Sequence, residues 1–214
     1  MSYSSTYFNI PSIDIDRIID LCDISEKRIW NIYLYGSQVY GNQTELSDFD
    51  FLVVASSMDR HKEFNDNLYN VHINTPDFFE GRLSEHQMGA IECIYAPSFA
   101  IIQEKRDFNF EIDPVKLKRK SLSESYNAFN RGKLKIMDGD MERGIKSLWH
   151  SMRILMFASQ ILSEGTIYDF SEANNLWSNI EESDYVKWEE FKSLVLPYKR
   201  ILENIVRDSR KIKA

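Results

Sequence analysis

Two aspartates, Asp48 and Asp50, stand one residue apart at the start of an apolar run in the stretch YLYGSQVYGNQTELSDFDFLVV, residues 33–54. Residues two apart in an extended strand point to the same face, so the two carboxylates are expected to lie side by side. Neighbouring carboxylates repel one another and are costly to desolvate unless a positive charge lies between them. A divalent cation that prefers oxygen ligands, Mg²⁺ or Mn²⁺, supplies that charge. The stretch therefore predicts a rigid strand that carries a metal site.

Glycines and a serine lie just upstream of the two aspartates. Gly36 allows a sharp turn and a close approach of the backbone to a ligand, and Gly41 allows a second close approach. The hydroxyl group of Ser37 and nearby N–H groups are suited to hold a phosphate. Tyr40 is a candidate for stacking on a base, and packing in the core explains it equally well. A phosphate cradle beside a metal-binding pair supplies the parts that phosphoryl or nucleotidyl transfer needs.

The first half of the chain alternates strand-like and helical segments. Apolar residues at helical spacing predict a helix over residues 15–23, and Pro76 marks the start of another. Runs rich in β-branched and aromatic residues, or with alternating polar and apolar positions, predict strands at residues 28–36, 50–56 and 67–75. Residues 91–104 are assigned to no element.

The second half of the chain loses its strand signals and carries apolar residues three and four apart, which indicates helices. Two long helices are predicted on either side of a turn at residues 138–140, and Gly165 is suited to end the second one. Ser171 is a candidate N-cap of a further helix. A last helix, bent near Pro197, is expected over residues 184–206.

Composition restricts the class of function. The 214 residues are 43% hydrophobic and 28% charged, which is typical of globular proteins, and no apolar run approaches the roughly 20 residues of a membrane span. Two cysteines in no metal-binding spacing, and an N-terminus unlike a secretion signal, indicate a cytoplasmic protein. The net charge of −7 argues against a general nucleic-acid-binding surface.

The order Gly-Ser, about ten residues, Asp-x-Asp and an apolar strand resembles the nucleotidyltransferase superfamily typified by DNA polymerase beta. The matching positions are Gly36, Ser37, Gly41, Ser47, Asp48 and Asp50. A short α/β domain followed by a helical domain is similar to the minimal and antibiotic-modifying members of that superfamily. The resemblance implies an α+β fold, with a mixed-sheet nucleotidyltransferase domain at residues 1–112 and a C-terminal helical bundle at residues 113–214.

The same resemblance implies an enzyme that moves a nucleoside monophosphate from a nucleoside triphosphate such as ATP to an acceptor hydroxyl group, with release of pyrophosphate. Asp48 and Asp50 would hold Mg²⁺ or Mn²⁺, and Gly36 and Ser37 would hold the triphosphate. The acceptor is a small molecule, an RNA end or a protein, and the acidic composition favours the small molecule.

One strand departs from the family pattern. Members with full activity usually carry a third carboxylate on the strand after the aspartate pair, and this chain has Asn70 there. His72 is a candidate proton acceptor because a neutral imidazole takes up a proton near pH 7, although a purely structural role in the strand is the simpler interpretation. Asp77 and Glu92 are further candidate acids. The alternative function is therefore a catalytically weakened nucleotide-binding or antitoxin-like regulatory partner.

The helical half offers three cationic or potentially cationic residues in a row. Lys146, His150 and Arg153 lie at positions i, i+4 and i+7 of a predicted helix, which places them on one face. Such groups are suited to bind the outer phosphates of a nucleotide. A solvated basic face without a ligand is the alternative.

Overall fold

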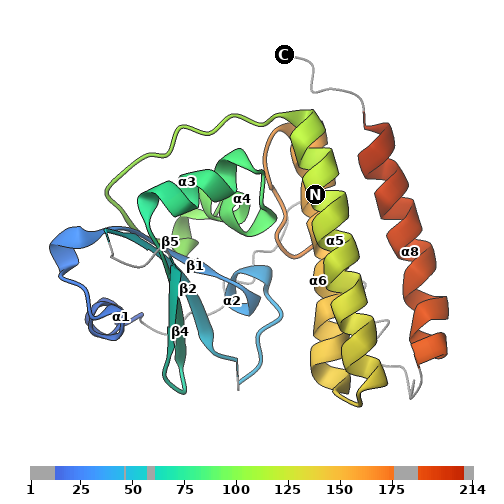
Figure 1. Cartoon of the computed structure of the whole chain (residues 1–214), viewed down its shortest axis with the longest axis horizontal. Coiled ribbons are helices and arrows are strands. Elements are labelled where there is room, and N and C mark those ends of the chain that lie inside the picture. The colour runs from blue at the N-terminus through green and yellow to red at the C-terminus, as the bar shows by residue number, and fades with distance from the viewer. Residues whose placement is uncertain (1–12, 46, 57–60, 176–187, 210–214) are drawn as a thin grey trace, which may run out of the picture. The chain divides into compact units, whose positions relative to one another are not determined.

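The computed structural model describes residues 13–45, 47–56, 61–175 and 188–209 (Figure 1). These residues divide into two compact units. The first consists of the described parts of Met1–Phe78 and Pro97–Asp107, and the second of those of Phe79–Ala96 and Phe108–Ala214. The helical unit thus includes a segment that precedes residue 113, where the sequence placed its start.

Within the described residues, a five-stranded mixed sheet forms the first unit, in the order β3-β4-β2-β1-β5. Strand β2 is parallel to β4, whereas the other neighbouring pairs are antiparallel. The strands are β1 (Ile29–Tyr35), β2 (Phe49–Ala55), β3 (His61–Asn65), β4 (Tyr69–Asn74) and β5 (Ile101–Glu104). The α+β class, the mixed sheet and the three predicted strands are therefore confirmed.

Apolar side chains hold the central strands in place. Phe51 and Val53 of β2 are fully buried, and so is Ile32 of β1. The predicted alternation on β4 is also present, since Val71 and Ile73 are buried while the intervening His72 is half-buried. This core fixes β2 in the middle of the sheet, between β1 and β4.

Strand β3, which the sequence did not predict, lies at the edge of the sheet. Its residues HKEFN are mostly exposed, so the apolar alternation that predicts a strand is missing. Polar and charged side chains are common on edge strands because they discourage pairing with other chains. This strand therefore forms because it pairs with β4, and its own residues carry no strand pattern.

Short helices connect the strands. Helix α1 (Ile15–Cys22) begins at Asp14, whose carboxylate accepts a hydrogen bond from the backbone N–H of Arg17 at 3.0 Å. Helix α2 (Ser37–Tyr40) is a single turn after β1, and α3 (Pro76–Ser84) starts at the predicted proline. The 3₁₀ helices are η1 (Glu26–Arg28) and η2 (Ser98–Ala100).

Helices build the second unit, and they include α4 (Met88–Ile94), α5 (Pro114–Met137), α6 (Met141–Glu164) and α8 (Trp188–Asp208). Gly165, with φ of 78°, ends α6 as predicted. The helix predicted after Ser171 falls largely on residues outside the described ranges. Each helix in the described part of the chain is too short or too polar to cross a membrane.

Two glycines allow α5 and α6 to pack very closely. A Cβ atom on Gly132 would lie 2.8 Å from the Leu148 side chain and 2.9 Å from the carbonyl oxygen of Gly144. A Cβ atom on Gly144 would lie 3.0 Å from the backbone nitrogen of Ile136. Ile136 and Leu148 belong to the buried core of this unit. The close packing of α5 and α6 therefore requires glycine, which has no side chain, at both positions.

Replacing Gly144 with alanine is expected to lower the free energy of unfolding by about 2 kcal/mol, because overlap with α5 outweighs the ~1 kcal/mol gained in helix propensity. Gly81→Ala on α3 is the matched control, since a Cβ atom there meets nothing within 4 Å. It should raise stability by about 0.5–1 kcal/mol. Urea unfolding measures both variants, and equal effects would contradict the close helix packing.

Candidate functional site

The two aspartates lie where the chain enters β2. Asp48 immediately precedes the strand and is exposed, whereas Asp50 is its second residue and is half-buried. In the strand register Asp50 lies between Tyr35 of β1 and Asn70 of β4. Because β2 is paired on both sides, the backbone fixes the place of the Asp50 carboxylate.

Burial, together with the negative charge of Asp48, raises the pKa of Asp50 to about 6. A hydrogen bond from Asn70 acts in the opposite direction, and the more distant charge of Glu63 adds to the increase. The two aspartates therefore interact electrostatically as predicted from their spacing. A cation bound between them would remove both the repulsion and the desolvation cost.

Asn70, which stands where the resemblance led us to expect a third acid, lies beside Asp50. Its Nδ2 donates a hydrogen bond to Oδ1 of Asp50 at 3.0 Å. Its own Oδ1 is buried without a hydrogen-bond partner, which costs on the order of 1–3 kcal/mol. Amide oxygens are ligands for hard cations. The strand thus offers a neutral oxygen donor where an acidic one was expected.

Gly36 lies directly against Asp50. Its φ is 76°, a conformation that favours glycine, and a Cβ atom there would collide with the Asp50 carboxylate. The following turn, α2, ends at Gly41, whose φ is 74°. Ser37, the first residue of this turn, is half-exposed. Tyr40 is only 7% exposed, which favours the packing role over base stacking.

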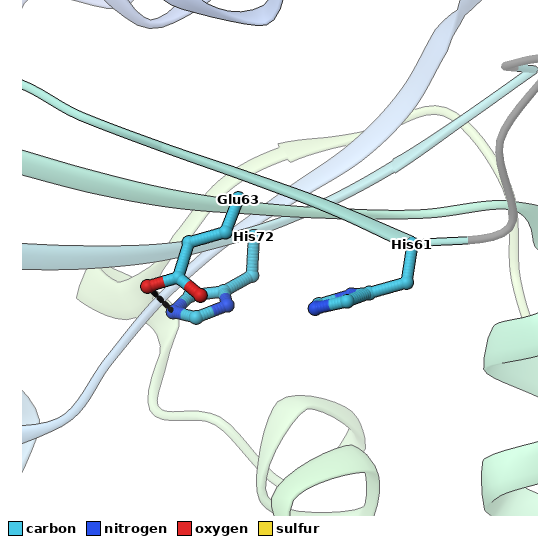
Figure 2. A group of neighbouring side chains, drawn as sticks. All are labelled: His61, Glu63 and His72. Carbon is cyan, nitrogen blue, oxygen red and sulfur yellow. Dashed lines mark ion pairs between the residues drawn. The ribbon is translucent and has the colours of Figure 1, made fainter.

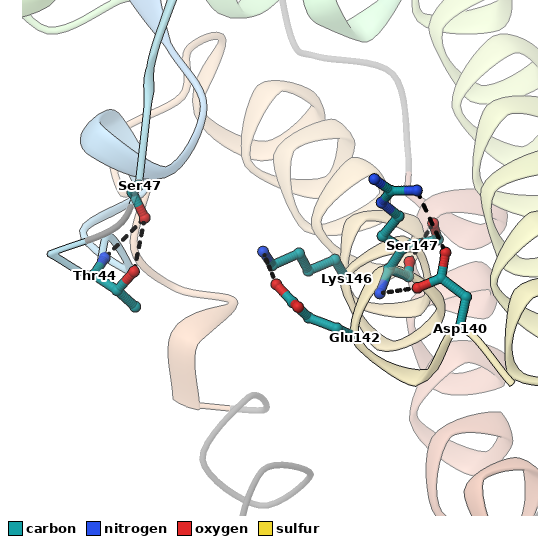
Figure 3. A network of polar contacts seen from close by, with 7 residues as sticks. Thr44, Ser47, Asp140, Glu142, Lys146 and Ser147 are labelled. Carbon is teal, nitrogen blue, oxygen red and sulfur yellow. Dashed lines mark hydrogen bonds and ion pairs between the residues drawn. The ribbon is translucent and has the colours of Figure 1, made fainter. Parts of the chain in front are cut away.

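Ser47 fixes the loop that leads into Asp48. Its Oγ accepts a hydrogen bond from the backbone N–H of Thr44 at 2.9 Å and lies 3.2 Å from Thr44 Oγ1 (Figure 3). The backbone N–H of Ser47 donates to the Thr44 carbonyl oxygen at 3.0 Å. These bonds form a compact turn. Ser47 therefore acts on the site by directing the chain into β2.

His72 lies two residues after Asn70 on the same face of β4 and is opposite Leu52 of β2. Its side chain is 22% exposed, and Nε2 is 3.9 Å from Oε1 of Glu63 (Figure 2). The ring packs edge-on against Tyr35, with centroids 6.0 Å apart. His72 therefore shares the sheet face of Asp50.

The three residues predicted on α6 differ in exposure. Lys146 is exposed, and its Nζ bonds to Glu142 at 2.7 Å (Figure 3). His150 is half-buried, and burial followed by the charges of Arg153 and Arg131 lowers its pKa to about 4. Arg153 is 4% exposed and lies over the Trp149 ring at 4.2 Å. Lys146 is therefore the one of these three residues whose charge is exposed to solvent.

The other two candidate acids differ in burial. Two further residues with metal-binding side chains lie on β3, which the sequence did not predict. Asp77 is exposed at the start of α3, whereas Glu92 is buried within α4. His61 and Glu63 of β3 were not considered because that strand was not predicted. The available signal was the spacing His-x-Glu, which places both side chains on one face of an extended segment.

Comparison with known proteins agrees with this geometry. Residues 17–112 match the family model described as the nucleotidyltransferase domain, which confirms the predicted resemblance over that range. No curated protein matched the chain.

Two solved structures are similar to the chain. One is a nucleotidyltransferase-like protein from Exiguobacterium sibiricum 255-15, with 15% identity and a TM-score of 0.36, covering 84% of this chain and 70% of that one. The other is the spectinomycin adenyltransferase AAD(9) from Enterococcus faecialis with ATP and spectinomycin, with 13% identity and a TM-score of 0.49. That match covers 91% of this chain and 98% of the other.

Asp50→Asn is expected to stabilise the metal-free protein by roughly 1–3 kcal/mol at pH 8, because the fold no longer holds a half-buried charge next to Asp48. The pKa of Asp50 is about 6 in the folded state against an ordinary 3.8. The wild-type penalty is therefore complete above pH 6 and fades as the pH falls toward 4.

Urea unfolding in EDTA at pH 8, 6 and 4.5 measures this difference. Asp77→Asn, which removes an exposed carboxylate, is the control and should show no comparable gain. A stability difference between Asp50→Asn and wild type that stays constant with pH, or a net loss, would contradict the assignment.

Proposed function

We propose that the protein transfers a nucleoside monophosphate from a nucleoside triphosphate to an acceptor hydroxyl group and releases pyrophosphate, since residues 17–112 match the nucleotidyltransferase domain model. The observation that carries this proposal is the position of Asp50. The central strand fixes its carboxylate beside Asp48 and Asn70, and Gly36 leaves the space against it free of a side chain.

Mg²⁺ or Mn²⁺ fits the donor atoms present. Asp48 and Asp50 offer carboxylates, and the Oδ1 atom of Asn70 is buried without a partner. All of these are hard oxygen ligands of the kind that these cations prefer. When bound, the ion supplies positive charge to the phosphate oxygens and to the charge that develops during transfer.

Gly36 and Ser37 are proposed to hold the triphosphate, because the turn that carries them lies directly against the Asp50 carboxylate and Ser37 is half-exposed. Within the helical unit, Lys146, with His150 and Arg153 further along α6, is proposed to bind phosphate groups. The pair between Lys146 and Glu142 is exposed and spaced i, i+4. Such pairs contribute only about 0.3–0.5 kcal/mol, so Lys146 can exchange Glu142 for a phosphate.

His72 is proposed to take the role of the missing acid. Its imidazole accepts the proton of the acceptor hydroxyl group as that oxygen bonds to the α-phosphorus. The bond between the α- and β-phosphates breaks, and pyrophosphate leaves with its electron pair. Glu63, 3.9 Å from Nε2, favours the imidazolium that results. The acidic chain favours a small-molecule acceptor over RNA.

A second candidate function is a nucleotide-binding regulatory partner of the antitoxin-like type. The neutral Asn70 beside Asp50 favours it, because one acid fewer weakens both metal binding and proton removal. Nucleotide binding alone does not separate the two functions, whereas turnover does.

Thermal unfolding with each of the four nucleoside triphosphates, with and without Mg²⁺, tests the nucleotide site. A hundredfold excess over Kd should stabilise the wild type by ~2.7 kcal/mol, which is several degrees in Tm. The shift should require Mg²⁺ and disappear in Asp48→Asn/Asp50→Asn. The matched control, Asp16→Asn/Asp20→Asn on α1, removes two exposed carboxylates elsewhere and should keep it.

Pyrophosphate release with a panel of small hydroxylated acceptors decides between the two functions. Release that needs the aspartate pair supports the transferase. A Mg²⁺-dependent Tm shift without release with any acceptor supports the regulatory partner. The absence of a shift with every nucleotide would contradict both.

Asn70→Asp is expected to tighten Mg²⁺ binding by roughly tenfold, about 1.4 kcal/mol, because it adds a third carboxylate to the donor set. The same change should lower the stability of the metal-free protein at pH 8, because a second negative charge then lies beside Asp50. Calorimetric titration with Mg²⁺ and urea unfolding in EDTA measure the two effects. Asn67→Asp, in the exposed turn between β3 and β4, is the control. Equal Mg²⁺ affinity of Asn70→Asp and wild type would exclude position 70 from the metal site.

A further inference from the structure

We propose that His61, Glu63 and His72 form a second metal site, which takes a transition-metal ion of the Zn²⁺ type. Figure 2 shows the three side chains gathered on one face of the strand pair β3–β4. Their potential ligand atoms, one from each residue, all lie within 4.8 Å of one another. The existence of this site does not rest on the proposed transferase function.

The strand pairing brings the three ligands together. In the antiparallel register Glu63 lies opposite His72, and His61 lies opposite Asn74. Directly opposed residues point to the same face, and so do residues two apart on one strand. The ligands of a tetrahedral Zn²⁺ site are roughly 3.3 Å apart, given Zn–N distances near 2.0 Å. Nε2 of His72 is already 3.9 Å from Oε1 of Glu63, so small side-chain rotations close the site.

Neighbouring rings hold the two histidines in position. The rings of His61 and His72 stack with centroids 5.9 Å apart and an interplanar angle of 19°. His72 also packs edge-on against Tyr35, and His61 lies 6.1 Å from the Phe78 ring. His72 comes from an interior strand, whereas His61 and Glu63 come from the exposed edge strand. The site therefore has one anchored ligand and two adjustable ones, with an open side for water.

The donor atoms select the class of ion. Two imidazole nitrogens and one carboxylate suit Zn²⁺ and similar borderline ions, whereas Mg²⁺ prefers oxygen ligands. Three protein ligands with a fourth position open to water are typical of non-structural zinc sites, whereas closed structural sites have four protein ligands. An ion pair between Glu63 and His72 does not involve His61, although the His61 ring stacks on His72. A shared cation accounts for all three residues.

The second site has a consequence for the transfer reaction, and this consequence does rest on the proposed function. A metal ion and a proton compete for the same lone pair of His72. Binding of Zn²⁺ to the His61–Glu63–His72 site should therefore inhibit transfer while leaving the Asp48–Asp50 pair free for Mg²⁺. The metal site is tested by spectroscopy alone, so its failure is distinguishable from that of the transferase.

Co²⁺ titration of the metal-free protein in excess Mg²⁺ tests the site, because four- or five-coordinate Co²⁺ absorbs visible light and Mg²⁺ covers the oxygen ligands. We expect one equivalent of Co²⁺ to give the visible bands and Zn²⁺ to displace it. His61→Ala and Glu63→Gln should each weaken binding on the order of tenfold or more. Lys62→Ala, on the same strand but the opposite face, is the matched control and should bind normally.

The aspartate variants separate the two metal sites. Asp48→Asn/Asp50→Asn should keep the Co²⁺ spectrum, and circular dichroism checks that each variant is folded. Loss of the spectrum in this double variant would overturn the proposal, because the ion would then belong to the aspartates. Wild-type Co²⁺ affinity in both His61→Ala and Glu63→Gln, or a complete absence of the visible bands, would also overturn it.

Discussion

The repulsion between two carboxylates at the entry to the central strand β2 is the constraint to which the neighbouring residues of the sheet are adapted. Burial and the neighbouring Asp48 raise the pKa of Asp50 to about 6, which disfavours the charged form that binds a cation. The fold tolerates this cost because Phe49 and Phe51, the buried residues on either side of Asp50, hold β2 in the core. Gly36 is constrained by the same carboxylate, since any Cβ atom would collide with it. This local cost in stability is of the kind found where a fold holds binding atoms in place for a ligand, which agrees with the proposed site.

Strand β4 reduces the cost of holding a charged Asp50 beside Asp48. Asn70 donates a hydrogen bond to Asp50 and carries no charge, so the metal-free site is less strained than it would be with a third acid. The same neutrality gives weaker attraction to a cation and no carboxylate to accept a proton. His72, two residues on, lies on the same face and is the proposed proton acceptor. With asparagine at position 70, the proposed mechanism places proton removal two residues further along the strand.

Local patterns in the sequence predicted the aspartate pair, β1, β2 and β4, because burial of these segments leaves an apolar period in the chain. Strand β3 leaves no such period, since its exposed residues are specified by pairing with β4, and His61 and Glu63 were missed with it. Helical spacing placed Lys146 and Arg153 on one face but did not reveal that Arg153 is buried over Trp149. The burial of Tyr40 is likewise a result of tertiary packing. The spacing of residues therefore predicts to which face of a helix or strand a side chain points, whereas tertiary packing decides whether that side chain is exposed.

The two candidate metal sites share one face of β4 but differ in ligand chemistry. Asp48, Asp50 and Asn70 present oxygen atoms, whereas the second site combines one carboxylate with the nitrogens of His61 and His72. Hard cations prefer the first set and borderline cations the second, so both ions can be present without exchanging places. His72 is the residue at which the sites meet functionally, because its lone pair serves either a proton or a metal ion. Since Mg²⁺ does not compete strongly for imidazole, the ion proposed to support transfer would not occupy the proposed proton acceptor, and only an ion of the other class would block it.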